Sequence, residues 1–178
     1  MPRKLREEFP DAVHHAYARG VNREVIYLDD EDRERYLALL GQVVERHGWC
    51  CLAFCLMHNH VHLLVKTPEP CLGRGMQRLH GVYAQYFNRR HGRFGHLFQG
   101  RFGAKVMRTD AQLLLAARYI ARNPVAAGLC GEASDWRWSS HPATLDGARP
   151  RWLDTPLLLG YFGADGGDPL DRYTEFVA

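Results

Sequence analysis

The chain has 178 residues, of which 46% are hydrophobic and 24% are charged, and its formal net charge is +3. This length and balance fit one globular domain with a small appendage and enough apolar residues for a core. No apolar run reaches the roughly 18 residues of a membrane span, and the charged start MPRKLREEFP lacks the apolar stretch of a signal peptide. Five cysteines without a CxxC pair indicate reduced thiols. We therefore expect a cytoplasmic protein that does not bind membranes.

The first half of the sequence predicts a strand, a helix and a hairpin. Residues 12–19 are compatible with a strand and are followed by glycine. Residues 29–48 begin with acidic residues, carry apolar residues at helical spacing and end at glycine, which predicts a helix. The apolar runs 49–57 and 60–66 predict two strands joined by a tight turn at residues 58–59.

The second half predicts a helix over residues 72–92, although its glycines weaken the pattern, and a short strand over 100–108. Thr109 predicts the cap of a third helix, which we expect to end at Asn123 because a proline follows. The tail is richer in glycine, proline and tryptophan and predicts one more helix near residues 155–163.

The order of these elements predicts an α+β fold. We expect a ferredoxin-like or RRM-like antiparallel sheet with helices packed on one face. Residues 1–130 would form the main domain, and residues 131–178 would form a C-terminal appendage packed on it.

Three histidines interrupt the apolar stretch MHNHVHLLVK. Because strand side chains alternate, His60 and His62 share one face and Val61 lies on the other. We expect the valine and leucine face to pack against the helices and the histidine face to be open to ligands. Residues at this spacing lie about 6–7 Å apart at Cα, so both imidazoles can converge on one metal ion. Two surface histidines with no joint task fit the spacing equally well.

Two other sites could use the same part of the chain. The three histidines together imitate the histidine-triad nucleotide hydrolases, although Asn59 breaks their alternation and no phosphate-binding turn follows. Cys51 or Cys55 could contribute to a structural zinc site, although the usual paired spacing is absent. Both alternatives stay open on these residues alone.

A cationic block lies between Pro70 and Thr109, where the sequence has eight basic residues and no acidic one. Aromatic residues interleave with these cations, a pattern typical of nucleic-acid binding, although a solvated helix face with a basic loop is also compatible. The candidate DNA-binding residues are Arg74, Arg78, Arg89, Arg90, Arg93, Arg101, Lys105 and Arg108.

Tyr119 and Asn123 lie four residues apart in the third predicted helix, so they project from the same side. A phenol is a weak nucleophile by itself, but it can attack a phosphodiester where a metal ion polarises the phosphate. Two imidazoles and an amide oxygen would suit Mg²⁺ or Mn²⁺. A packing tyrosine with an asparagine cap fits the local sequence as well.

Four stretches in order, MHNHVHLLV, YAQYFNRRHGRFGHLFQGRF, RYIARNPVAAGL and WRWSSH, carry a family resemblance. Their combination resembles the REP-associated tyrosine transposases, which are relatives of the insertion-sequence-200-like single-tyrosine transposases within the HUH endonuclease superfamily. The resemblance runs from about residue 14 to the C-terminus. It departs at His58, where many relatives have proline, so the role of this histidine stays open.

The resemblance implies a metal-dependent endonuclease and strand transferase that acts on single-stranded DNA and catalyses transposition. It implies that Tyr119 is the nucleophile, that His60 and His62 are metal ligands, and that Asn123 completes the metal site. The expected cofactor is Mg²⁺ or Mn²⁺. The expected intermediate is a 5′-phosphotyrosine link with a free 3′-OH. The expected partners are single-stranded hairpins of repeated extragenic palindromes.

Other functions and properties stay open. The chain could be a domesticated regulator that binds palindromic repeats without cutting them, or a histidine-triad nucleotide hydrolase. It could act as a monomer or as a homodimer. The exact hairpin and the physiological metal are not determined by the sequence.

Overall fold

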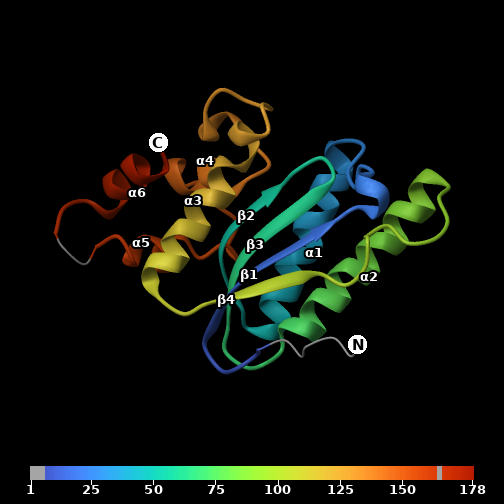
Figure 1. The fold of residues 1–178 in the computed structure, drawn as a ribbon, viewed down its shortest axis with the longest axis horizontal. Coiled ribbons are helices and arrows are strands. Elements are labelled where there is room, and N and C mark those ends of the chain that lie inside the picture. Colours follow the sequence, from blue (N-terminus) through green and yellow to red (C-terminus); the bar gives the residue numbers. More distant parts are fainter. Residues whose placement is uncertain (1–6, 164–165) are drawn as a thin grey trace.

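The computed structural model describes residues 7–163 and 166–178. It contains one four-stranded sheet with helices on both of its faces (Figure 1). The elements in chain order are β1 Ala12–Arg19, η1 Val21–Arg23, α1 Asp30–His47, β2 Cys50–Leu56, β3 His60–Thr67, α2 Leu72–His91, β4 Gly103–Met107, α3 Asp110–Ala126, η2 Ala133–Asp135, α4 Ser140–Asp146, α5 Thr155–Gly160 and α6 Pro169–Val177.

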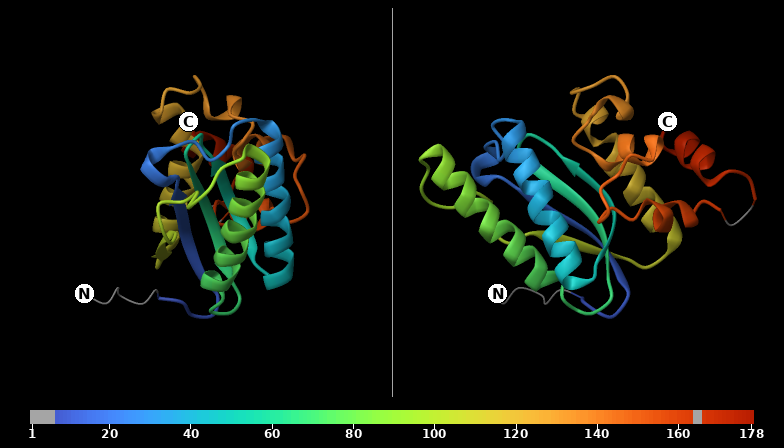
Figure 2. Two further views of the ribbon diagram at one scale, coloured as in Figure 1. Left: turned by 90° about the vertical axis from the view of Figure 1, so that its right-hand side faces the viewer. Right: turned by 180° about the vertical axis from the view of Figure 1, so that it is seen from behind.

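The strands lie in the order β2-β3-β1-β4, and every neighbouring pair is antiparallel. Helices α1 and α2 lie together on one side of the sheet, and α3 lies on the other side (Figure 2). The predicted α+β class is therefore confirmed. Each strand and each of the three long helices was predicted within a few residues of its observed position.

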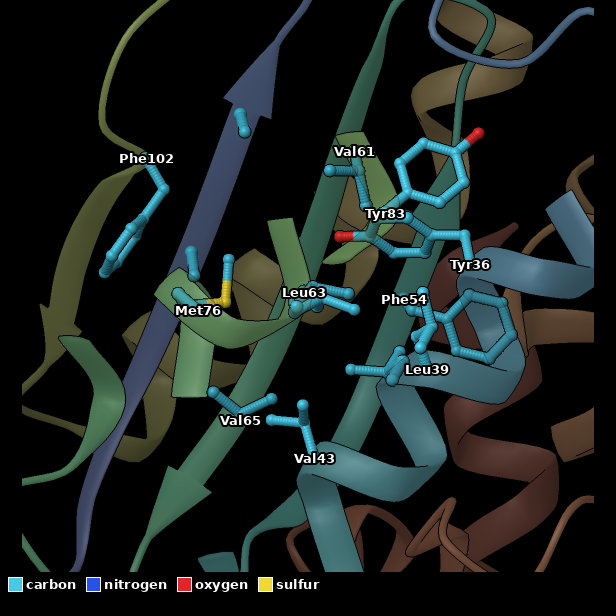
Figure 3. Close-up of a cluster of buried hydrophobic side chains, with 14 of the residues drawn as sticks. Tyr36, Leu39, Val43, Phe54, Val61, Leu63, Val65, Met76, Tyr83 and Phe102 are labelled. Atoms are coloured by element: carbon cyan, nitrogen blue, oxygen red, sulfur yellow. The ribbon is translucent and has the colours of Figure 1, made fainter. Parts of the chain in front are cut away.

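The main core lies between the sheet and helices α1 and α2. The β3 side chains Val61, Leu63 and Val65 are fully buried there, as the alternation of the strand predicted (Figure 3). Their neighbours in the cluster include Tyr36, Leu39 and Val43 of α1, Phe54 of β2, and Met76 and Tyr83 of α2.

The opposite face is only partly open, which corrects the expectation that the histidine face is free. Leu113, Ala117 and Ile120 of α3 pack in a second core with Leu52 of β2 and Leu64 of β3. This packing covers β2 and β3. Parts of β1 and β4 on the same face stay exposed.

The predicted end of the third helix at Asn123 is wrong, because α3 continues through Pro124 to Ala126. A proline removes its own N–H from the helical ladder and crowds the carbonyl four residues earlier, but it leaves the N–H groups that follow it free to bond. The Ala127 N–H still donates to Asn123 O at 3.0 Å, so the helix gains a further turn.

The segment after α3 holds more helix than expected. Besides α5, which was predicted, it forms α4 and α6, and it packs on α3 and β2 through the second core. Asp168 caps α6 and Pro169 occupies its first turn, a start signal that the sequence does contain. Trp136 anchors the segment by donating its indole N–H to Leu56 O at 3.1 Å. In the part of the chain that the structure describes, no helix combines the length and apolarity needed to cross a membrane.

One glycine of α2, Gly75, has a packing reason that yields a test. A Cβ built on Gly75 would lie 2.2 Å from Cζ2 of the buried Trp49, whose indole N–H donates to Cys71 Sγ. Gly75→Ala must therefore displace a core aromatic ring. We expect it to lower the free energy of unfolding by about 1–3 kcal/mol in urea denaturation.

Gly81 provides the matched control on the same helix. A Cβ there would meet no atom within 4 Å. Gly81→Ala should therefore raise the free energy of unfolding by up to about 1 kcal/mol through helix propensity. Equal effects of the two substitutions would contradict the close approach of α2 to Trp49.

Candidate active site

The antiparallel register of β1 and β3 places the polar side chains of the two strands side by side. Tyr17 of β1 lies opposite His62 of β3, and Arg19 lies opposite His60. Residues directly opposite each other in a sheet share a face. His15, two residues before Tyr17, therefore lies on this face as well.

β4 extends the same face on the other side of β1. Lys105 lies opposite His15, and Gly103 lies opposite Tyr17. The histidine face thus carries imidazoles, a phenol ring and the cations Arg19 and Lys105 over three neighbouring strands.

Helix α3 adds the two residues that the sequence singled out. Asn123 Oδ1 lies 3.2 Å from His60 Nε2, and the ring centroids of Tyr119 and His62 lie 5.4 Å apart. Tyr119 is 53% exposed, whereas His62 is only 7% exposed. The three expected metal ligands and the expected nucleophile therefore lie together, although they come from segments far apart in the sequence.

The surroundings of His60 decide which of its nitrogens has a free lone pair. Asn59 Nδ2 donates to Arg23 O at 2.9 Å, which turns the Asn59 Oδ1 toward His60 Nδ1 at 2.7 Å. That oxygen only accepts, so the His60 proton is on Nδ1 and Nε2 presents a lone pair.

His60 Nε2 then faces Asn123 Oδ1, which is also an acceptor. Either the amide turns over to donate its N–H, or a cation joins the two atoms. Their separation of 3.2 Å is close to the spacing of about 3 Å between neighbouring ligands of an octahedral ion with 2.0–2.1 Å bonds. The residues present therefore fit a small divalent cation.

His62 is oriented by another histidine. His15 Nε2 lies 3.0 Å from His62 Nδ1, so one ring donates to the other. When His62 donates from Nδ1, its Nε2 keeps a lone pair on the side of the ring away from His15.

Burial keeps these imidazoles uncharged. It lowers the pKa of His62 to about 3 and that of His15 to about 4, and it also lowers the pKa of His60. The nearby cations Arg19 and Lys105 add to this lowering. Neutral imidazoles are the form that binds metal ions.

The alternative sites receive less support from the geometry. His58 stacks edge-on against Trp136 at 5.6 Å between ring centroids. Cys51 and Cys55 are buried, and burial raises the pKa of both thiols. Within residues 7–163 and 166–178, no three His, Cys, Asp or Glu side chains cluster as a metal site.

The cationic block does not form one patch. Arg74, Arg78 and Arg89 are exposed on α2, on the side of the sheet opposite the histidines. Arg74 also lines a cavity of about 840 Å³ with Arg101, between α2 and residues 95–102. Lys105 lies on the histidine face.

Arg90 belongs to an ion-pair network that joins the end of α2 to the start of α1. Its guanidinium contacts the carboxylates of Asp29, Glu31 and Asp32 at 2.7–2.8 Å. His91 adds a 3.0 Å contact to the buried Asp32. Hydrogen bonding from Arg90 lowers the pKa of Asp29 to about 2. Arg90 therefore has a structural role, because it holds the two helices together.

Two further members of the block have carboxylate partners. Arg93 pairs with Glu24, and Arg108 pairs with Glu7. Their charges are partly balanced, so a DNA contact by either one would compete with an ion pair.

Sequence reasoning missed His15, Tyr17 and Arg19. Their spacing by two was visible in HHAYAR, because alternate residues of a strand share a face. The sequence pattern does not show, however, that this strand pairs with the histidine strand.

Comparison with known proteins shows the family of this chain. The family described as "Transposase IS200 like" matches residues 7–123. A protein of Haemophilus influenzae described as a REP-associated tyrosine transposase is 27% identical over 130 residues, which cover 67% of this chain and 73% of the relative.

A solved structure has the same fold. It is described as a REP-associated tyrosine transposase bound to a REP hairpin, and it superposes with a TM-score of 0.70 at 20% identity. The match covers 84% of this chain and 89% of the other. Because the family match covers more than half of the chain and includes all four strands of the sheet, the chain belongs to the IS200-like transposase family.

Proposed function

We propose that this chain is a metal-dependent endonuclease and strand transferase for single-stranded DNA, with Tyr119 as its nucleophile. The observation that carries the proposal is the position of Tyr119 and Asn123 over the His60–His62 pair. A helix surface that merely packed on the sheet would not need an exposed phenol beside two neutral imidazoles.

The proposed step exchanges one ester for another. Tyr119 Oη forms a bond to phosphorus, and the bond from phosphorus to the 3′ oxygen breaks. The phenol loses its proton to solvent, which reaches this half-exposed side chain, and the 3′ oxygen takes up a proton from solvent. The product is a 5′-phosphotyrosine and a free 3′-OH, and reversal of the step joins strands.

His60 Nε2, His62 Nε2 and Asn123 Oδ1 would hold the divalent ion, Mg²⁺ or Mn²⁺. When bound, such an ion supplies Lewis-acid polarisation of the scissile phosphate. The protein groups position the phosphate beside Tyr119, and Asn59 and His15 hold the two imidazoles in the required tautomers.

We propose hairpins of palindromic repeats as the substrate, because the similar solved structure is described as bound to a REP hairpin. Residues 1–130 would form the catalytic domain and residues 131–178 its appendage. A non-cleaving regulator would not require a nucleophile at the histidine pair. A histidine-triad hydrolase would require His58 at the site, whereas this residue stacks on Trp136.

Replacement of the nucleophile tests the proposal. We expect Tyr119→Phe to bind a DNA hairpin normally and to form no covalent adduct in Mn²⁺ on a denaturing gel. Tyr86→Phe, which removes a surface hydroxyl near Glu31, should keep adduct formation. An adduct in Tyr119→Phe would exclude Tyr119 as the nucleophile. Tight binding without any wild-type adduct would favour the regulator.

Substitutions of the neighbouring residues Arg89 and Arg90 distinguish an arginine that contacts DNA from one that stabilises the fold. Arg89→Ala should weaken hairpin binding and reduce the salt slope of log K by about 1, with an unchanged melting temperature. Arg90→Ala should lower the melting temperature, because three carboxylates lose their common partner. The reverse pattern would show that Arg90, and not Arg89, contacts DNA.

His15 should act through His62. We expect His15→Ala to weaken Mn²⁺ binding about 10–100-fold in titration calorimetry without DNA. His15→Gln, which can still accept a hydrogen bond, should recover part of the loss. Unchanged Mn²⁺ affinity in His15→Ala would show that His62 needs no such partner.

A further inference from the structure

Tyr17 is an exposed aromatic residue that the proposed chemistry does not use. It lies on β1 directly opposite His62, with the two ring centroids 6.2 Å apart, and it is 38% exposed. An aromatic ring left in solvent beside a reaction centre is available to a ligand.

The ring of Tyr17 is supported by a missing side chain on the next strand. A Cβ built on Gly103 would lie 2.4 Å from both Cε2 and Cζ of Tyr17. The ring therefore fills the space in which a side chain of β4 would stand. Glycine at this position lets the ring lie over the strand, where it forms part of the sheet surface.

Two cations flank this ring on the same face. Arg19 follows Tyr17 by two residues on β1, and Lys105 follows Gly103 by two residues on β4. Neither has a carboxylate partner among the residues that the structure describes. The charge of Arg19 lowers the pKa of His60, and the charge of Lys105 lowers the pKa of His15. Both cations therefore lie close to the site.

We propose that Tyr17 is a stacking platform for one unpaired base of the DNA strand next to the scissile phosphate, and that Arg19 and Lys105 contact the phosphates on either side of this base. Base stacking on an aromatic ring between backbone-binding cations is the usual way in which proteins hold single strands. The inference rests on the proposed function and adds a binding subsite to it.

This role predicts that the ring matters and the hydroxyl does not. Tyr17→Phe should keep full affinity for single-stranded extensions, whereas Tyr17→Ala should bind them more weakly. Gly103→Val leaves Tyr17 intact but occupies the space of its ring. It should therefore reproduce the effect of Tyr17→Ala.

The experiment uses the full chain carrying Tyr119→Phe, so that the DNA stays uncut. The probe is a hairpin with a single-stranded extension in which one base at a time is 2-aminopurine. At one position we expect fluorescence quenching that is present in Tyr17→Phe and absent in Tyr17→Ala. The affinity for the extended hairpin should fall about tenfold in Tyr17→Ala, and that for a blunt hairpin should not change.

Two outcomes would overturn the inference. Equal affinity and quenching in Tyr17→Ala, with hairpin binding and wild-type adduct formation intact, would remove the platform and leave the proposed function standing. A loss in Tyr17→Phe as large as that in Tyr17→Ala would assign the effect to the hydroxyl. A wild-type chain that binds no hairpin would contradict the proposed function itself.

Discussion

The antiparallel pairing of β1 with β3 is the constraint on which the candidate site depends. Its register puts Tyr17 opposite His62 and Arg19 opposite His60, and it brings His15 within hydrogen-bonding distance of His62. A slip of β1 by one residue would turn His15, Tyr17 and Arg19 into the core between the sheet and α1. Ala16 and Ala18 of β1 oppose such a slip, because they are buried in that core with the valines and leucine of β3.

The second requirement is the placement of α3, and the C-terminal segment contributes to it. The helix buries Leu113 and Ile120 against β2 and β3, so Tyr119 projects from its solvent side beside the histidines. Arg122, one turn further on, donates to the backbone oxygens of Val177 and Ala178 at the end of α6. The segment beyond α3 thus holds the helix that carries the proposed nucleophile.

Much of this arrangement follows from local pattern. Period-two alternation assigned His60 and His62 to one face, and four-residue spacing put Tyr119 and Asn123 on one side of a helix, as observed. Properties that depend on strand pairing were not accessible, which is why the partners on β1 were missed. The charge count could not show how the cations are distributed. Once the chain folds, they lie on two faces of the sheet, and Arg90, Arg93 and Arg108 pair with carboxylates.

The proposed function requires a covalent bond between Tyr119 and DNA, which mass spectrometry can locate. Trypsin cleaves after Arg118 and Arg122, so Tyr119 lies on a short peptide that contains no other tyrosine. After reaction with a hairpin in Mn²⁺ and nuclease digestion, we expect a nucleotide mass on the 119–122 peptide. A nucleotide on the peptide that contains Tyr17, or on no peptide although the DNA is cut, would contradict this expectation.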